Sequence, residues 1–290
     1  MVTTVWEKRF RSWKKPLSKT EVSRFKRVLQ LILDALHDSL ALQGYDFKVR
    51  VFGSYRNRTN LRTLSDIDVY VACKAPRAKS RFWRRLAQGT VYRWVAPPWY
   101  SRFKKEVQSA LEVTFGSHAV DRRNKAIGIR KTAERAGADV LVCVERRSGI
   151  EFWPDRGKRI VSWPELHRRR AASWNQEVRR YKAMVRLLKG LRHLLIRKGV
   201  RGPDRVSSFM IECLVWNVPR NYYAADDYMS NLRGILSYLR SGLHSLRHWP
   251  RWWQVNEKER LTSLLRKRRE DVCRFIDAAW EELGFEPVEG

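Results

Sequence analysis

The sequence lacks the features that mark membrane, secreted and zinc-binding proteins. No apolar run reaches the roughly 18 residues that a membrane-spanning helix needs, and residues 1–15 are polar and basic without a hydrophobic signal core. The 4 cysteines lie far apart and form no CxxC pair, which argues against a zinc site and fits reduced, buried thiols. Internal repeats and low-complexity segments are also missing. We therefore expect a globular, cytoplasmic protein with no membrane partner.

Acidic residues are scarce. Only 30 Asp and Glu accompany 60 Lys and Arg, which gives a formal net charge of +30 and an isoelectric point near 10.7. This excess is larger than a triphosphate pocket needs and favours a polyanionic partner, so an RNA or DNA activator on a basic surface is one expectation. The alternative is a solvated, arginine-rich surface that binds nothing specific. Composition alone leaves both open.

Length and hydrophobic content are sufficient for two lobes. The 290 residues are 43% hydrophobic and include 13 Trp, which is enough for a sizeable core. Ser18 and Glu21 form an S-x-x-E capping box, which predicts the start of a long amphipathic helix. Strand patterns follow it, and helical patterns dominate the end of the chain. We predict an α+β protein with a sheet lobe and its N-terminal spine helix over residues 1–170, and a helical lobe over residues 171–290.

The most informative stretch joins a strand to a small-residue turn. From residue 47 to residue 51 apolar side chains alternate with Lys48 and Arg50, which predicts a half-buried strand that ends in a turn at Gly53 and Ser54. Glycine has no Cβ, so backbone N–H groups can approach a phosphate closely there, and the serine adds a hydroxyl. We therefore expect Gly53 and Ser54 to bind a nucleotide phosphate.

Three aspartates complete the predicted site. Apolar residues at positions 67, 69 and 71 share one face of a second strand, so Asp66 and Asp68 project together from the other face, about 7 Å apart. Asp139 opens a third, apolar strand, where an acid is unfavourable unless it is paired or binds a metal. Two-metal phosphoryl chemistry requires acidic ligands of this kind. The set predicts a site for Mg²⁺ or Mn²⁺.

The second half of the chain offers groups that suit a nucleotide. From residue 174 to residue 195 apolar residues mark one helical face, and a basic stripe that includes Lys182 and Lys189 runs beside it. The stripe either points into a ligand cleft or is the solvated face of a core helix. A further helix begins at Ser207 or Ser208, and its N-terminus can bind an anion. The proline-rich and aromatic segment at residues 74–98 is predicted to close over the site.

The order of these features resembles the nucleotidyltransferases of the cyclic GMP-AMP synthase and oligoadenylate synthase type. That order is Gly-Ser, Asp-x-Asp, a late Asp-Val on a strand, a Leu-Leu-Lys helix and Ser-Ser-aromatic. Gly-Ser with Asp-x-Asp alone marks the whole polymerase-β-like superfamily, and the C-terminal phrases narrow the resemblance to the bacterial CD-NTase branch, which makes cyclic oligonucleotide signals in antiphage defence. The supporting phrases, over about residues 6–260, are Pro16-Leu17-Ser18, Phe52-Gly53-Ser54-Tyr55, Ser65-Asp66-Ile67-Asp68, Asn124-Lys125-Ala126-Ile127, Ala138-Asp139-Val140, Gly149-Ile150 and Ile211-Glu212-Cys213-Leu214-Val215-Trp216-Asn217.

The resemblance implies a polymerase-β-like sheet lobe, a C-terminal helical lobe and an active site in the cleft between them. The three aspartates would bind the metals and the glycine-serine pair the phosphate. Lys189 would neutralise the triphosphate, Ser208 would hydrogen-bond it and Phe209 would hold the donor base; we add Lys182, from the same basic stripe, to this nucleotide-binding set. One departure is that the family often has Asp-Val-Val-Pro where this chain has Asp139-Val140-Leu141-Val142. The zinc-binding insertion of the animal DNA sensor is absent.

The implied activity joins ATP or other NTPs into a cyclic di- or trinucleotide, with release of pyrophosphate, and the product reaches a downstream effector. One rival function is an RNA- or small-molecule-directed nucleotidyltransferase, which uses the same acids but makes linear or acceptor-linked products. The other is a catalytically silent nucleic-acid-binding protein, which would account for the charge but not for three costly acids in so basic a chain.

Overall fold

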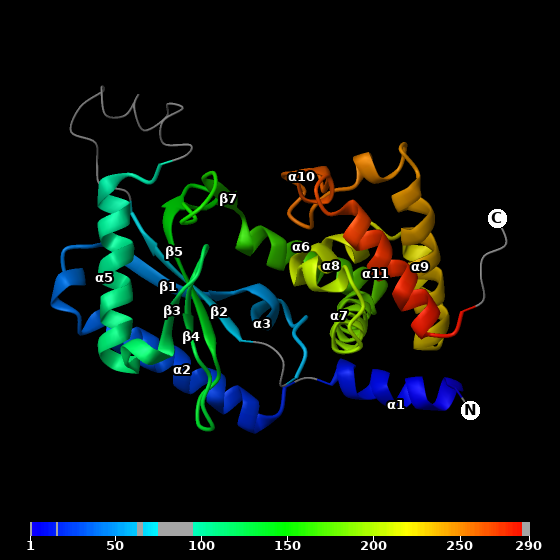
Figure 1. Cartoon of the computed structure of the whole chain (residues 1–290), viewed down its shortest axis with the longest axis horizontal. Coiled ribbons are helices and arrows are strands. Elements are labelled where there is room, and N and C mark those ends of the chain that lie inside the picture. The colour runs from blue at the N-terminus through cyan, green and yellow to red at the C-terminus, as the bar shows by residue number, and fades with distance from the viewer. Residues whose placement is uncertain (1, 16, 63–65, 75–94, 286–290) are drawn as a thin grey trace. The chain divides into compact units, whose positions relative to one another are not determined.

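Figure 1 shows the computed structural model, which describes residues 2–15, 17–62, 66–74 and 95–285. The chain divides into two compact units. The sheet unit comprises Leu17–Arg56 and Thr63–Glu165, and the helical unit comprises Met1–Pro16, Asn57–Arg62 and Leu166–Gly290. Most of the segment predicted to close over the site, residues 75–94, lies outside the described residues.

The sheet unit is built on one mixed sheet. Its seven described strands pair in the order β1-β2-β5-β4-β3, and β6 and β7 continue from β5. β2 and β5 are parallel, and the other pairings are antiparallel. The strands are β1 (Phe47–Phe52), β2 (Ile67–Cys73), β3 (Val120–Arg122), β4 (Ile127–Ile129), β5 (Ala138–Arg146), β6 (Gly149–Phe152) and β7 (Ile160–Ser162).

Two long helices, α2 (Lys19–His37) and α5 (Pro98–Phe115), pack against each other and share one hydrophobic core with the sheet. The capping box predicted at the start of α2 is present, because Ser18 Oγ accepts from the Glu21 N–H and the Glu21 carboxylate accepts from the Ser18 N–H. Along β2 buried apolar residues alternate with half-buried ones at Asp68 and Tyr70, as predicted. The core therefore fixes β2 with Asp68 on the opposite face.

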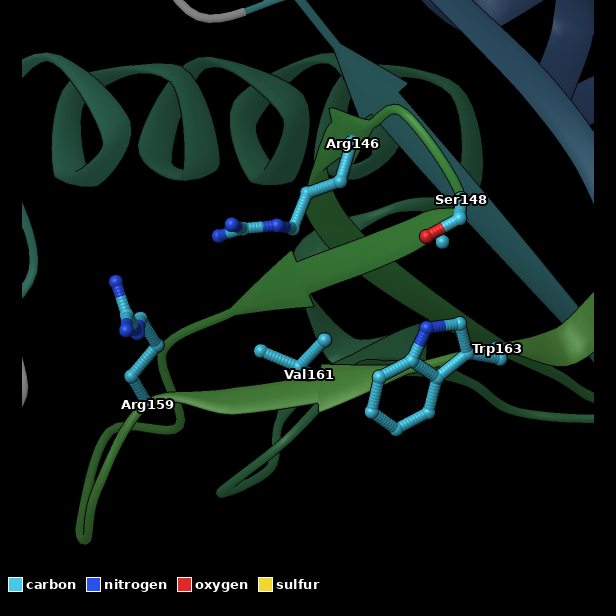
Figure 2. A pocket seen from close by; sticks show the side chains of 6 residues that line it. Arg146, Ser148, Arg159, Val161 and Trp163 are labelled. Atoms are coloured by element: carbon cyan, nitrogen blue, oxygen red, sulfur yellow. The ribbon is translucent and has the colours of Figure 1, made fainter. Parts of the chain in front are cut away.

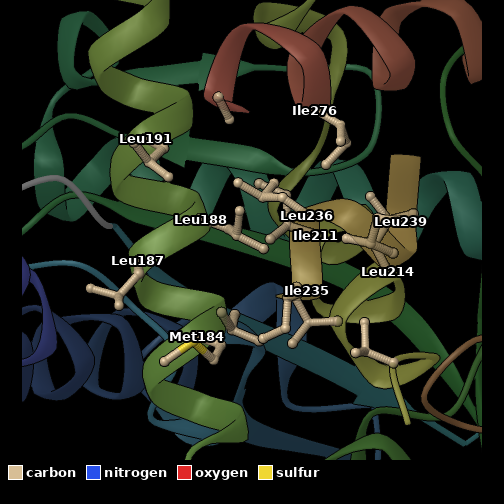
Figure 3. Packing of buried hydrophobic residues seen from close by; sticks show 14 of the residues in the cluster. Met184, Leu187, Leu188, Leu191, Ile211, Leu214, Ile235, Leu236, Leu239 and Ile276 are labelled. Atoms are coloured by element: carbon tan, nitrogen blue, oxygen red, sulfur yellow. The ribbon is translucent and has the colours of Figure 1, made fainter. Parts of the chain in front are cut away.

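The helical unit is all helix in its described part, apart from loops and an isolated bridge. Figure 3 shows apolar side chains that meet in its core, among them Leu188, Ile211, Leu236 and Ile276. The helices are α1 (Val2–Lys14), α6 (Pro164–Val178), which starts at the end of the sheet unit, α7 (Tyr181–Arg197), α8 (Ser208–Trp216), α9 (Tyr228–His244), α10 (Thr262–Leu265) and α11 (Arg269–Glu282).

The units differ from the predicted lobes of residues 1–170 and 171–290. α1 packs on α7 and buries Trp6 and Phe10 in the helical core, so the N-terminus belongs to the helical unit. Asn57–Arg62 also belongs to that unit, where Thr59 is fully buried. These assignments depend on long-range packing, which no local pattern encodes.

The apolar face predicted from residue 174 to residue 195 belongs to two helices. α6 ends at Val178 and α7 begins at Tyr181, and Arg179 between them has a φ of 57°. Trp174 and Tyr181 both contact the ring of Trp216, which explains why the apolar period continues across the break.

Two expectations from composition can be compared with the described residues. Cys73, Cys143 and Cys213 are buried, Cys273 is half-buried, and all of them are free thiols. None of the helices in the described ranges is both long and apolar enough to cross a membrane.

Asp155 ties three parts of the sheet unit together. Its carboxylate accepts from Lys104 Nζ of α5 at 2.8 Å and from Arg122 Nε at the end of β3 at 2.9 Å. Its backbone N–H donates to the carbonyl of Asn124 at 2.8 Å. Arg122 and then Lys104 lower the pKa of Asp155 to about 2.

We predict that Asp155→Asn lowers the melting temperature at neutral pH, because buried Lys104 loses its counter-charge. Solvent screens the 35% exposed carboxylate, so the loss should be only about 1–2 kcal/mol. The folded pKa lies below the unfolded value of about 3.9, so the stabilisation is present above that value and is lost as pH falls towards 2. Thermal unfolding between neutral and acidic pH checks this.

Asp121→Asn is the control for that experiment, since it removes an exposed carboxylate paired with exposed Arg130 in the same sheet unit. It should change the melting temperature little at any pH. A loss in Asp155→Asn that did not shrink in acid would contradict the assignment.

Candidate active site

The three predicted aspartates lie on or beside neighbouring strands. Asp68 in β2 is the register partner of Asp139 in β5, and neighbouring strands lie about 4.8 Å apart. Asp66 immediately precedes β2, where the Ile67 N–H donates to the Gly137 carbonyl at 3.0 Å. The Asp66 carboxylate lies over Gly137, since a Cβ built there would be 2.4 Å from Asp66 Oδ1. The fold therefore brings acids from two distant stretches of the chain together where the parallel strands β2 and β5 begin.

Gly53 and Ser54 follow β1 directly beside Asp68. Phe52, the last residue of β1, pairs with Asp68. Gly53 has a φ of +66°, and a Cβ at this position would lie 2.0 Å from Asp68 Oδ2, so a larger residue would displace the carboxylate. The predicted turn is wrong in one respect, because Gly53 and Ser54 begin a short helix, α3 (Gly53–Asn57).

Asp139 lies in a partly buried and highly charged environment. Burial raises the pKa of Asp139; Arg123 opposes that rise and the negative charge of Asp66 adds to it. Arg123 Nη1 donates to Asp139 Oδ1 at 2.6 Å, and the Asp139 side chain is 33% exposed. A guanidinium therefore balances the charge of the third acid.

The donor atoms suit a hard divalent cation, although the side chains are not gathered around one. Within the described ranges, no group of three or more His, Cys, Asp or Glu is arranged to hold a metal ion. Asp139 is engaged by Arg123 instead. Carboxylate oxygens are the ligands that Mg²⁺ and Mn²⁺ prefer, and like charges on adjacent strands favour a cation between them. The three acids therefore supply donor atoms of the kind that such a metal binds, and their role as its ligands stays a prediction.

Lys189 is buried inside the helical unit. Its Nζ donates to Glu212 Oε1 at 2.7 Å, to the Thr59 carbonyl at 3.1 Å and to Thr59 Oγ1 at 3.4 Å. An ammonium has three donors, so these contacts use its full capacity. In this arrangement Lys189 has no N–H left to donate to a triphosphate, although the sequence predicted that contact. Its contacts instead give it a packing role.

Glu212 and His167 are the partners that sequence reasoning missed. His167 Nε2 lies 2.9 Å from Glu212 Oε2, and Asn57 and Thr59 also donate to this carboxylate. Burial would raise the pKa of Glu212, but Lys189 and then His167 outweigh it and hold the pKa well below its usual range. The available signal was an acid inside an apolar helix, because such an acid needs a buried partner.

Lys182 lies on α7 near other cations. It is half-buried, and burial together with the charges of Arg58, Arg186 and Arg168 lowers the pKa of Lys182. Arg186 donates to the backbone carbonyl of Arg58, which holds two of these cations together. Clustered positive charge favours a polyphosphate anion. Lys182 therefore suits a triphosphate better than Lys189 does.

Ser208 and Phe209 occupy the first turn of α8. The cap of this helix is Ser207, whose Oγ accepts from the Met210 N–H at 3.1 Å, so Ser208 is not needed for capping. Ser208 and Phe209 are half-buried, and the Phe209 ring lies 5.3 Å from the His167 ring. Their nucleotide contacts stay predictions. They belong to the helical unit together with Lys182, and the aspartates belong to the sheet unit.

A separate hollow of about 250 Å³ lies on the sheet unit at the β5-β6-β7 end. Figure 2 shows Val161 in β7, Arg159 and Trp163 just before and just after that strand, and Arg146 at the end of β5. Glu151 forms ion pairs with both Arg146 and Arg159, which balances part of their charge. None of the predicted site residues lines this hollow.

Comparison with known proteins gives two matching family models. Residues 171–284 match the cGAS/DncV-like nucleotidyltransferase C-terminal helical domain. Residues 33–97 match a nucleotidyltransferase domain. The two matches fall mainly in the helical and the sheet unit, respectively.

Relatives match along almost the whole chain. The cyclic dipurine nucleotide synthase of Elizabethkingia meningoseptica is 32% identical over 97% of this chain and 99% of its own length. The cyclic dipyrimidine nucleotide synthase CdnE of Legionella pneumophila is 31% identical over 95% of this chain and 97% of its own. The structure of Elizabethkingia meningoseptica CdnE cyclic dinucleotide synthase with GTP and Apcpp superposes with a TM-score of 0.78 and 30% identity, covering 96% of this chain and 99% of that one.

We predict that Lys189→Met mainly lowers stability, whereas Lys182→Met mainly weakens nucleotide binding. Lys189→Met should destabilise the protein by about 3–5 kcal/mol, because Glu212 loses its buried counter-charge. Lys182→Met should change stability by less than about 1 kcal/mol and weaken ATP binding. Thermal unfolding and ATP titration measure both effects.

The double variant Lys189→Met/Glu212→Gln serves as a control, since removing both charges should recover part of the lost stability. If Lys189→Met kept its stability and lost ATP binding, the packing role of Lys189 would be refuted.

Proposed function

Because the chain belongs to the family of cGAS/DncV-like nucleotidyltransferases, we propose that it joins two nucleoside triphosphates into a cyclic dinucleotide and releases pyrophosphate. The observation that carries this proposal is the parallel register of Asp68 and Asp139, with Asp66 one step before β2. The relatives matched along their full length are named for products of two nucleotides, which supports a cyclic dinucleotide over a trinucleotide.

In this proposal Asp66, Asp68 and Asp139 hold Mg²⁺ or Mn²⁺. Such a metal supplies charge stabilisation at the α-phosphate and activates a hydroxyl nucleophile. The chain contributes the spacing, because the paired backbones of β2 and β5 fix the acids before substrate binds. Gly53 keeps the Asp68 carboxylate in place, and the Ser54 hydroxyl donates to a phosphate oxygen.

The proposed reaction runs twice. A ribose hydroxyl of one nucleotide attacks the α-phosphate of the other, so a phosphodiester forms, the bond to the β-phosphate breaks and pyrophosphate leaves. The remaining triphosphate of the linear product then undergoes the same attack by the free ribose hydroxyl, which closes the ring. Lys182 and Ser208 hold the triphosphate in this scheme, and Phe209 stacks on the donor base.

The choice of bases is set by the nucleotide pocket. Two relatives of nearly equal similarity are named for dipurine and dipyrimidine products. Discrimination between such bases depends on a few hydrogen-bonding side chains rather than on the acids that perform the chemistry. We propose ATP and/or other nucleoside triphosphates as the substrates, and the mass of the product identifies the two bases.

We further propose that the product signals to a downstream effector in antiphage defence and that a nucleic acid activates synthesis. Support for the activator comes from an exposed basic and aromatic surface on the helical unit. Trp253 is 36% exposed, the Arg260 guanidinium lies 3.6 Å from the centre of its ring, and Arg260 also donates to the Arg251 carbonyl. An exposed indole beside arginines is typical of surfaces that stack single-stranded bases.

We predict that Asp66→Asn, Asp68→Asn and Asp139→Asn each lower nucleotide incorporation at least a thousandfold, because each removes a carboxylate ligand. Incubation with labelled NTPs and Mg²⁺ or Mn²⁺, phosphatase treatment and mass analysis identify the product. Asp121→Asn, an aspartate elsewhere on the same sheet, is the control and should retain activity. Phosphatase-sensitive products would instead favour linear or acceptor-linked transfer, and full activity in Asp68→Asn would refute the site.

We predict that Trp253→Ala and Arg260→Gln weaken binding of single-stranded RNA by about 1–3 kcal/mol. Loss of one phosphate contact in Arg260→Gln should also lower the salt dependence of binding by about one ion. Fluorescence anisotropy at several salt concentrations measures both. Arg130→Gln, the same charge change on the sheet unit, is the control. RNA that neither binds nor alters synthesis would rule the activator out.

A further inference from the structure

Arg123 lies in the β3-β4 hairpin, and β4 is one of the two strands next to Asp139. Arg123 follows β3, and its backbone N–H donates to the Ala126 carbonyl in the turn before β4 at 2.9 Å. Its guanidinium lies over Gly128, because a Cβ on Gly128 would be 2.5 Å from Arg123 Cζ. Gly128 is the register partner of Asp139. A residue with a side chain at position 128 would therefore push the guanidinium off the acid.

The guanidinium occupies the coordination space of the third acid. Arg123 Nη1 donates a hydrogen bond to Asp139 Oδ1 at 2.6 Å, and the proposed function assigns this carboxylate to the metal. Asp139 lies beside Asp68 and feels the charge of Asp66, so this corner of the sheet needs a cation. The side chain of Arg123 is 46% exposed and can leave for solvent without opening the core.

We propose that Arg123 is a built-in counterion that competes with the divalent cation for Asp139 and thereby sets the affinity of the metal site. The inference rests on the proposed metal-binding role of the three aspartates. Metal binding then requires Asp139 to exchange a guanidinium for a cation of higher charge. Arg123 keeps Asp139 paired at low cation concentration and weakens metal binding by the free energy of the ion pair.

The chain offers a matched control on the same hairpin. Arg130 follows β4 and pairs with Asp121 of β3 through Nη2 to Oδ1 at 3.1 Å, with the arginine side chain 63% exposed. Arg123→Gln and Arg130→Gln therefore remove the same charge from the same β3-β4 hairpin. Only the first of them removes a partner of Asp139.

The test titrates Mn²⁺ alone into protein stripped of metals, without nucleotide, and counts free Mn²⁺ by electron paramagnetic resonance. Arg123→Gln should bind Mn²⁺ about fivefold more tightly than the wild type, as expected for a half-exposed ion pair. Arg130→Gln should stay within about twofold, and so should Arg123→Lys, which keeps the charge. Asp139→Asn should lose most binding, and Arg123→Gln should bring no gain in the Asp139→Asn background.

Wild-type protein provides a second measurement that does not depend on a variant folding. Phenylglyoxal modifies accessible guanidinium groups, and peptide mass spectrometry reads each arginine separately. Mg²⁺ should raise the labelling rate of Arg123 several-fold and leave that of Arg130 unchanged.

Two results separate the possible failures. The counterion role is wrong if Arg123→Gln binds Mn²⁺ no more tightly than the wild type, or if Mg²⁺ does not change the labelling of Arg123. In both cases Asp139→Asn still loses Mn²⁺ binding, so the metal site itself stands. Asp139→Asn that binds Mn²⁺ as tightly as the wild type overturns the metal site of the proposed function itself.

Discussion

The parallel pairing of β2 with β5 is the constraint on which the candidate site depends. It places Asp68 opposite Asp139, and the same ladder places Asp66 over Gly137. Gly53, directly after β1, lies against Asp68, and Gly128 of β4 lies beside Asp139, where a Cβ would meet the Arg123 guanidinium. The core formed with α2 and α5 holds this geometry rigid. The backbones that carry the acids are thus placed before substrate arrives, although Asp139 still has to exchange Arg123 for a metal.

A second, buried electrostatic centre organises the helical unit. Glu212 of α8 contacts Lys189 of α7, His167 of α6 and Thr59 of the segment Asn57–Arg62, which also belongs to the helical unit. Buried ion pairs add little net stability but are costly to break, so the cluster fixes how these elements pack. Lys182 and the first turn of α8 are thereby held on one framework, which suits their proposed contacts with a nucleotide.

Local patterns predicted β1, β2 and β5, the capping box of α2 and the positions of the candidate acids, because period-two alternation and an acid at the start of an apolar strand are visible in a few residues. The remainder depends on contacts distant in sequence. Nothing local distinguishes Arg123 from the other cations among 60 Lys and Arg, and only the fold places it on Asp139. Lys189 likewise has the spacing of a ligand-facing residue, and only the structure reveals Glu212 beneath it.

The proposed nucleotidyl transfer requires a divalent cation at the start of β2 and β5, where the three aspartates lie. The most direct measurement is a crystal structure of the protein soaked with Mn²⁺ and a non-hydrolysable NTP, with anomalous scattering used to locate the metal. We expect anomalous peaks within about 2.5 Å of carboxylate oxygens from Asp66, Asp68 and Asp139, with Arg123 displaced from Asp139. Peaks confined to other sites, with Arg123 still on Asp139, would contradict this metal site.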